Sequence, residues 1–98
     1  MNITKTVNGN DLVVSIVGRL DTSTATIFED FISENIIGIN NLTLDFKEVD
    51  YISSAGLRVI LSTQKKMTQV GTMKVINVCD LIMEVFEITG FADILTIE

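Results

Sequence analysis

Two adjacent serines are the residues of this chain best placed to take part in chemistry. Ser53 and Ser54 stand just after the apolar Ile52 and just before Ala55-Gly56, where an amphipathic stretch begins. One interpretation is an ordinary helix cap, in which a serine hydroxyl accepts a free N–H at the helix start and contributes about 1 kcal/mol. The other is a phosphoacceptor, because a phosphate at that place carries about −1.5 to −2 charges and faces the positive end of the helix. The residues alone leave both interpretations open.

An acidic residue is expected close to these serines. Asp21, followed by Thr22 and Ser23, stands at the end of an earlier apolar run, as the serines do after a later one. The carboxyl ends of parallel strands meet at one edge of a sheet, and neighbouring strands lie about 4.8 Å apart. If the two runs are neighbouring strands, Asp21 approaches Ser54 and can hydrogen-bond its hydroxyl or repel a phosphate there. The alternative role for Asp21 is that of a cap or turn residue.

The composition excludes several other kinds of chemistry. The chain contains no histidine, so a serine or cysteine nucleophile lacks its usual imidazole base and a catalytic zinc ion lacks its usual ligands. We therefore expect no enzymatic activity, no metal site and no cofactor. The 7 Lys and Arg residues against 13 Asp and Glu give a net charge of −6, so counterion release cannot drive binding to nucleic acid or to an anionic membrane surface.

Length and cysteine use indicate one domain in the cytoplasm. The 98 residues, 47% of them hydrophobic, suffice for a single core over residues 1–98. Cys79 is the single cysteine, so it forms no internal disulfide and is interpreted as a small buried hydrophobe. No secretory leader opens the chain, and no apolar run approaches the roughly 18 residues that cross a bilayer. We expect no direct membrane insertion, and a monomer or a weak dimer formed through Ile36-Ile37 or an uncovered sheet face.

Alternating apolar and polar residues predict the strands. These are expected at residues 3–7, 12–17, 42–46, 73–78 and 94–97. The first two flank Asn8-Gly9-Asn10, which is typical of a hairpin turn. The polar residues 47–50 are expected to form a loop after the third strand.

Apolar residues at helical spacing predict three helices between the strands. Thr22 or Ser23 is expected to cap the first, one of the two serines the second, and Asp80 a short third helix. Glycines are expected to close them in turn, at Gly38, Gly71 and Gly90.

The order of these elements predicts an α/β fold. A strand, a helix and a further strand call for parallel pairing through right-handed crossovers, while the opening hairpin adds an antiparallel edge. If every crossover moves one strand in the same direction, the helices all fall on one face. We therefore expect a single domain with a mixed, mostly parallel sheet of four to five strands and helices packed mainly on one face.

Four segments carry a resemblance to a known family. The segment from Asp45 to Leu61, which contains the paired serines, resembles the signature of the bacterial anti-sigma factor antagonists of the STAS domain family. The segment from Gly18 to Ala25 is similar to the family's other signature, and residues 75–78 and 85–91 resemble its next strand and its last helix and turn. The likeness covers essentially the whole chain and is more specific to STAS domains than to one role among them.

The resemblance implies a partner-switching cycle that regulates transcription. The unphosphorylated protein would bind a partner that is both an anti-sigma factor and a serine kinase, and would thereby release the sigma factor. The kinase would then phosphorylate the serine two residues before the glycine of the motif, which is Ser54 in this chain. A metal-dependent serine phosphatase would reset the protein, which performs no chemistry of its own.

The same resemblance implies a docking surface around the acceptor. Asp21 matches the family's acidic residue near the acceptor, and Arg58 stands at a variable position. Many members carry Asp where this chain has Ser53, so Ser53 becomes a second candidate acceptor, and Ala55 replaces a more usual hydroxyl residue. The expected surface comprises Asp21, Thr22, Ser53, Ser54, Ala55, Gly56, Leu57 and Arg58.

Other functions are less well supported by the residues. A second STAS role is a permanent subunit of a membrane-associated transport complex with no phosphate cycle. An aspartyl-phosphate receiver domain needs paired acids after its first parallel strand and a longer chain. A small-molecule enzyme would need a base and a glycine loop that cradles phosphate, and the sequence offers neither.

Overall fold

The computed structural model describes residues 1–98 and contains one five-stranded sheet with three α-helices and a 3-10 turn. The strands are Asn2–Asn8 (β1), Asp11–Leu20 (β2), Asn41–Ile52 (β3), Thr72–Ile76 (β4) and Thr96–Ile97 (β5). The helices are Thr22–Asn35 (α1), Ser54–Val70 (α2) and Asp80–Thr89 (α3), and the 3-10 turn is Phe91–Asp93 (η1).

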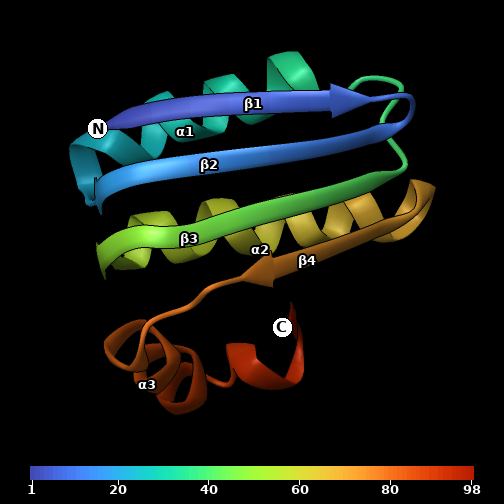
Figure 1. Cartoon of the computed structure of the whole chain (residues 1–98). Helices are drawn as coiled ribbons and strands as arrows, with labels where there is room; N and C mark the ends of the chain where they lie inside the picture. Colours follow the sequence, from blue (N-terminus) through green and yellow to red (C-terminus); the bar gives the residue numbers. More distant parts are fainter.

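The sheet follows the order of the sequence, β1-β2-β3-β4-β5. The pair β1 and β2 is an antiparallel hairpin that turns at Gly9, whose φ of +61° suits glycine, and every other pair is parallel. Figure 1 shows α1 and α2 together behind the sheet, with α3 beside the β4 edge. The expected mixed, mostly parallel α/β sheet is therefore confirmed.

The core lies between the sheet and its helices. Alternate residues of the two central strands are buried there, and they pack against Phe28 of α1 and Ile60 of α2. The buried strand residues are Leu12, Val14 and Ile16 from β2, and Leu42, Leu44 and Phe46 from β3. Their neighbours Val13 and Val17 are exposed on the other face of the sheet.

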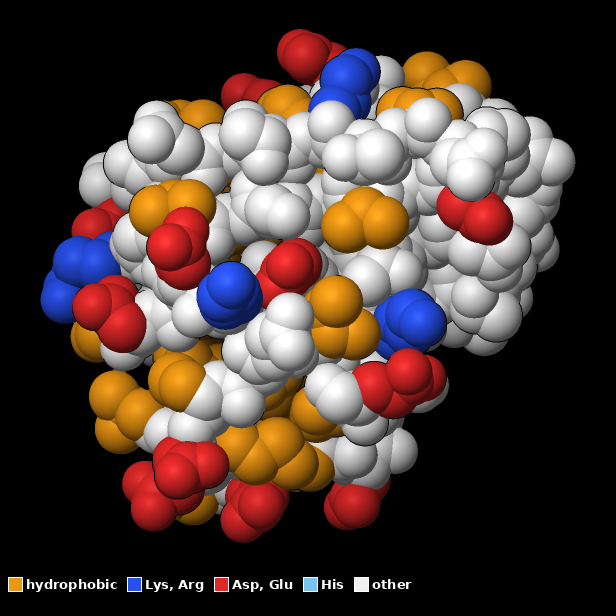
Figure 2. Space-filling view, viewed as in Figure 1, with side chains coloured by type: hydrophobic (Ala, Val, Ile, Leu, Met, Phe, Trp, Pro, Cys, Tyr) orange, Lys and Arg blue, Asp and Glu red, His pale blue; other side chains and the backbone are white.

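The uncovered face of the sheet is mainly polar. Figure 2 shows it as white surface with separate hydrophobic side chains, whereas hydrophobic and acidic side chains gather lower in the view, over α3 and the end of the chain. The exposed hydrophobic residues of that lower part are Leu81, Ile88 and Ile94. No helix combines the length and the apolar character that crossing a membrane requires.

Several strand boundaries differ from the prediction: β2 runs on to Leu20, β5 begins at Thr96 instead of Ile94, and β3 and β4 differ for identifiable reasons. Residues 47–50 continue β3 instead of forming a loop, because pairing with β2 resumes beyond irregularities at Ser15/Val17 and Gly18/Arg19 and buries Val49. The fourth strand stops at Ile76, two residues early, because Asn77 takes a φ of +59° that no strand accommodates.

The start of α3 also corrects two predictions. The N-cap of α3 is Cys79, which makes no side-chain capping bond, and Asp80 is the first residue of the helix instead of its cap. Cys79 is exposed, not buried. The reason is its position in the loop at the carboxyl end of β4, outside the core.

Candidate functional site

Three helices begin at one edge of the sheet. The starts of α1, α2 and α3 follow the carboxyl ends of β2, β3 and β4, at the left of Figure 1. The Ser53 N–H donates to the Leu20 carbonyl at 2.8 Å, which ties the start of α2 to the end of β2. The expected neighbourhood of the two loops is therefore confirmed.

Asp21 is the N-cap of α1, which confirms the alternative role of a cap for Asp21 and corrects the expectation that Thr22 or Ser23 caps this helix. Its carboxylate Oδ1 accepts the N–H groups of Ser23 at 3.0 Å and Thr24 at 2.9 Å, and the Ser23 hydroxyl at 2.8 Å. The Asp21 N–H donates to Thr24 Oγ1 at 2.9 Å, which completes a capping box. Thr24 can accept the Asp21 N–H because it stands three residues after the cap, at the position that a capping box requires.

These bonds hold the carboxylate in its charged form. The Thr24 N–H, followed by the Ser23 hydroxyl, lowers the pKa of Asp21 from its ordinary value of 3.8 to about 2. All hydrogen bonds of this carboxylate go to its own helix, and none reaches Ser54. Asp21 therefore adds a permanent negative charge to this edge without a direct bond to the candidate acceptor.

Ser53 is the N-cap of α2. Its hydroxyl accepts the Gly56 N–H at 3.3 Å, a long bond, and its backbone is extended with φ −94° and ψ 173°. The side chain is half-buried. Of the two serines, Ser53 thus takes the capping role.

Ser54 is the first residue of α2. It is exposed, and its hydroxyl makes no hydrogen bond within the chain. The first N–H groups of a helix have no intrahelical acceptor and give this end a partial positive charge. A free hydroxyl beside that charge can accept a phosphate without the loss of any hydrogen bond within the fold.

Gly56 brings the first turn of α2 against the strand ends. A Cβ atom on Gly56 would lie 3.0 Å from Ile52 Cγ1 and 3.1 Å from the Leu20 carbonyl oxygen. Gly56 and Leu57 are buried, Ala55 is half-buried, and Thr22 and Arg58 are exposed. The expected docking residues are therefore split between an accessible surface and the packing that supports it.

A shallow groove between α1 and α2 borders this surface. It has a volume of about 280 Å³, and its lining is Thr22, Ala25, Thr26, Glu29, Ala55, Arg58 and Val59. Thr26 and Glu29 were not among the predicted residues. They follow Thr22 by four and seven positions, a helical spacing that puts them on the same face of α1.

A second contact at this edge lies on the uncovered face of the sheet. The guanidinium of Arg19 sits 4.0 Å from the centre of the Tyr51 ring, and the two residues are paired across β2 and β3. Sequence patterns do not predict this contact, because it depends on the strand register beyond the irregularities in β2.

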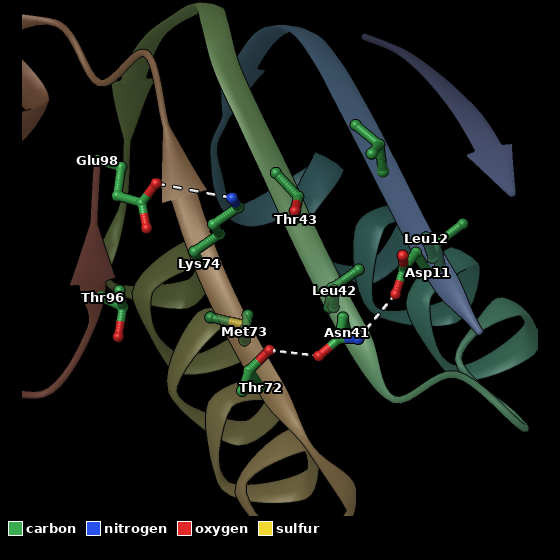
Figure 3. Close-up of a pocket in the computed structure, with 11 residues that line it drawn as sticks. Asp11, Leu12, Asn41, Leu42, Thr43, Thr72, Met73, Lys74, Thr96 and Glu98 are labelled. Carbon is green, nitrogen blue, oxygen red and sulfur yellow. Dashed lines mark hydrogen bonds and ion pairs between the residues drawn. The ribbon is translucent and has the colours of Figure 1, made fainter. Parts of the chain in front are cut away.

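The largest depression of the surface lies away from this edge. It has a volume of about 530 Å³ on the uncovered face, near the amino ends of the parallel strands (Figure 3). Asn41 donates to Asp11 at 2.7 Å and accepts from Thr72 at 2.8 Å, while Lys74 pairs with Glu98 at 3.6 Å. These polar groups bind one another, and no group of three or more His, Cys, Asp or Glu side chains could hold a metal ion anywhere in the chain.

Comparison with known proteins identifies the family. The model of the STAS domain matches residues 2–98. The anti-sigma-B factor antagonist of Bacillus subtilis is 31% identical over 98 residues, which cover 99% of this chain and 90% of the relative. The chain therefore belongs to the STAS domain family, and the resemblance of its sequence to the anti-sigma factor antagonists is confirmed.

Solved structures share the fold. The anti-sigma factor antagonist SpoIIAA in its unphosphorylated form matches with a TM-score of 0.78 at 17% identity, covering 99% of this chain and 87% of that one. The Bacillus cell fate determinant SpoIIAA in its phosphorylated form matches with a TM-score of 0.77 at 18% identity, covering 99% and 91%. A sulfate transporter family protein from Wolinella succinogenes matches with a TM-score of 0.78 at 18% identity, covering 93% and 75%.

Proposed function

We propose that this protein is a cytoplasmic anti-sigma factor antagonist controlled by phosphorylation of Ser54. In its unphosphorylated form it binds an anti-sigma factor that is also a serine kinase, and the sigma factor is released. Phosphorylation ends this binding. The observation that carries the proposal is the exposed, unbonded hydroxyl of Ser54 at the start of α2, together with the relationship to a curated anti-sigma-B factor antagonist.

Docking takes place on the accessible part of the helix starts. Thr22, Ser54 and Arg58 are exposed, and Asp21, Ser53 and Ala55 are partly so. Gly56 and Leu57 are buried, so they act by shaping this surface.

The phosphate works by charge and bulk. The kinase transfers the γ-phosphoryl group of ATP to Ser54 Oγ, which loses its proton, and about −1.5 to −2 charges appear on the docking surface. The helix dipole of α2 stabilises this anion, so the fold persists while the surface changes. A metal-dependent serine phosphatase hydrolyses the ester and restores the hydroxyl. The protein itself supplies the acceptor and no catalytic group.

The choice between the two serines follows from their bonds. The Ser53 hydroxyl accepts the Gly56 N–H, so attachment of a phosphate there would disturb the cap. The Ser54 hydroxyl makes no hydrogen bond within the chain, so a phosphate there would disrupt none. Phosphorylation at Ser54 is therefore favoured over phosphorylation at Ser53.

The test is mass spectrometry of the protein purified from its own cells. We expect one phosphate on the intact chain and its assignment to Ser54 by fragment mapping. The variant Ser54→Ala should carry none, and the matched variant Ser53→Ala should still carry it. Phosphate confined to Ser53, or a chain that carries no phosphate in any growth condition, would contradict the proposal. If the phosphate is found on Ser54, a pulldown with unphosphorylated protein should recover the kinase.

A second candidate function has one observation in its favour. The fold also matches a sulfate transporter family protein, so the chain could instead serve as a permanent STAS subunit of a membrane-associated transport complex. In that case binding to the partner would be the same for wild type and for Ser54→Glu. Transporter genes beside the coding sequence would support this role, whereas kinase and phosphatase genes would support the first.

A further inference from the structure

Arg58 lies one helical turn after Ser54 on α2. Residues four apart on a helix share a face, with Cβ atoms about 5–6 Å apart. Both side chains are exposed. Helical side chains lean toward the N-terminus of their helix, so Arg58 leans toward the turn that carries the Ser54 hydroxyl.

Arg58 has no partner in the unphosphorylated chain. The single ion pair between side chains joins Lys74 to Glu98, and the Arg58 guanidinium makes no hydrogen bond within the chain. Arg19, by comparison, lies against Tyr51. Arg58 shares the groove between α1 and α2 with Glu29, yet the two form no ion pair.

We propose that Arg58 is the intramolecular partner of a phosphate on Ser54. Its guanidinium donates a pair of N–H bonds to two phosphate oxygens, a geometry that Arg matches and Lys does not. The anion then stands N-terminal to the cation by four residues, which is the favourable order on a helix. This inference rests on the proposed function only for the origin of the phosphate.

The neighbouring charges do not prevent this contact. Glu29 on α1 is the acidic residue that lines the same groove as Arg58, but it forms no ion pair with Arg58, so the guanidinium is free to turn toward Ser54. The Asp21 carboxylate accepts bonds from Ser23 and Thr24, so it offers Arg58 a poorer acceptor than the phosphate does.

Phosphorylation would then change the charge of the docking surface in two ways. It adds an anion at Ser54, and it withdraws the cation of Arg58 from any acidic group of a docked partner. A single modification thereby reverses the charge that this part of the surface presents.

The test uses phosphoserine inserted at position 54 during translation, so no kinase is needed. Phosphorus NMR follows the titration of the phosphate in the folded protein. A cation beside the phosphate favours its dianion and lowers its pKa, so Arg58→Gln should raise that pKa toward the value in a short phosphoserine peptide. Arg58→Lys should restore part of the difference.

The control is Lys66→Gln, which removes an exposed positive charge from the same helix two turns further on. It should leave the phosphate titration unchanged. An equal titration in wild type and Arg58→Gln, or an equal shift in Lys66→Gln, would overturn the inference. Failure of the proposed function would look different, because it would leave Ser54 unphosphorylated in cells while the inserted phosphate still titrated as expected.

Discussion

The starts of α1 and α2 lie side by side at one edge of the sheet, yet their polar groups are used in opposite ways. At α1, the Asp21 carboxylate accepts several bonds from Ser23 and Thr24 in a complete capping box. At α2, Ser53 accepts a single bond at 3.3 Å and Ser54 makes none. The first start is stabilised by its side chains, and the second keeps a hydroxyl free.

This difference is the physical ground on which the proposed modification is assigned to Ser54. The capping bonds of Asp21 occupy one of its two carboxylate oxygens, Oδ1, so this side chain is partly committed to its own helix. An exposed hydroxyl that makes no hydrogen bond contributes little to the free energy of unfolding, so its modification leaves the fold intact. Substitutions that change one helix start at a time test this comparison.

The largest loss of stability is expected from Gly56→Ala. The added Cβ would lie 3.0 Å from Ile52 Cγ1 and 3.1 Å from the backbone oxygen of Leu20, so these neighbours or the first turn of α2 must shift by a few tenths of an ångström. Overpacking costs about 1–3 kcal/mol and alanine regains up to about 1 kcal/mol of helix propensity over glycine, so we expect the free energy of unfolding to fall by about 1–2 kcal/mol in urea denaturation. A change of less than about 0.5 kcal/mol, the size typical of surface substitutions, would show that the turn can shift freely.

The next effect is expected from Asp21→Asn, and it should depend on pH. Because the bonds to Thr24 and Ser23 lower the pKa of Asp21 from 3.8 to about 2, the charged form stabilises the folded state above pH 3.8. That contribution is lost as the pH falls through the folded pKa. The stability difference between wild type and variant should thus be constant near neutral pH and shrink between about pH 4 and pH 2. If the stability difference between wild type and Asp21→Asn does not change with pH, the charge of the Asp21 carboxylate does not stabilise the fold.

A smaller effect is expected from Ser53→Ala. The variant loses the cap of α2, and we expect a cost of about 0.5–1 kcal/mol because the bond to the Gly56 N–H is long. Thermal melts of wild type and variant measure the cost. If the variant is as stable as wild type, the cap bond contributes nothing, and Ser53 regains equal standing as an acceptor.

The smallest effect on stability is expected from Ser54→Ala. Its hydroxyl makes no bond, so the free energy of unfolding should stay within about 0.5 kcal/mol of wild type. The same substitution should abolish phosphorylation. Adjacent serines would then show opposite results, with Ser53 affecting the fold and Ser54 affecting the modification.

The general fold was predictable because its signals are periodic. Alternation in β2 and β3 and helical spacing in α1 and α2 identify the elements, and the sequence of connections leaves few topologies. The extension of β3 through residues 47–50 was not predictable, because those polar residues lack alternation and are held by pairing with β2 beyond its irregularities.

The candidate site was predictable in its residues but not in their bonds. Sequence patterns identified Asp21 and both serines, while the capping box with Thr24 and the division of roles between Ser53 and Ser54 required backbone geometry. The exposure of Cys79 was missed for the same reason, since a residue type alone does not place a loop outside the core.

The order of the strands has a consequence for how the chain folds. From β2 onward, each strand pairs with the one before it in the sequence. During synthesis, the pairing partner of each new strand has therefore already left the ribosome. The hairpin of β1 and β2 closes the shortest loop, whereas each parallel pair must close a much longer one, as from Asp11 to Asn41 or from Asn41 to Thr72, so the hairpin is expected to form first. The sheet can then grow in one direction during synthesis, from the N-terminal hairpin to the two residues of β5, which form a short final edge that discourages aggregation with other chains.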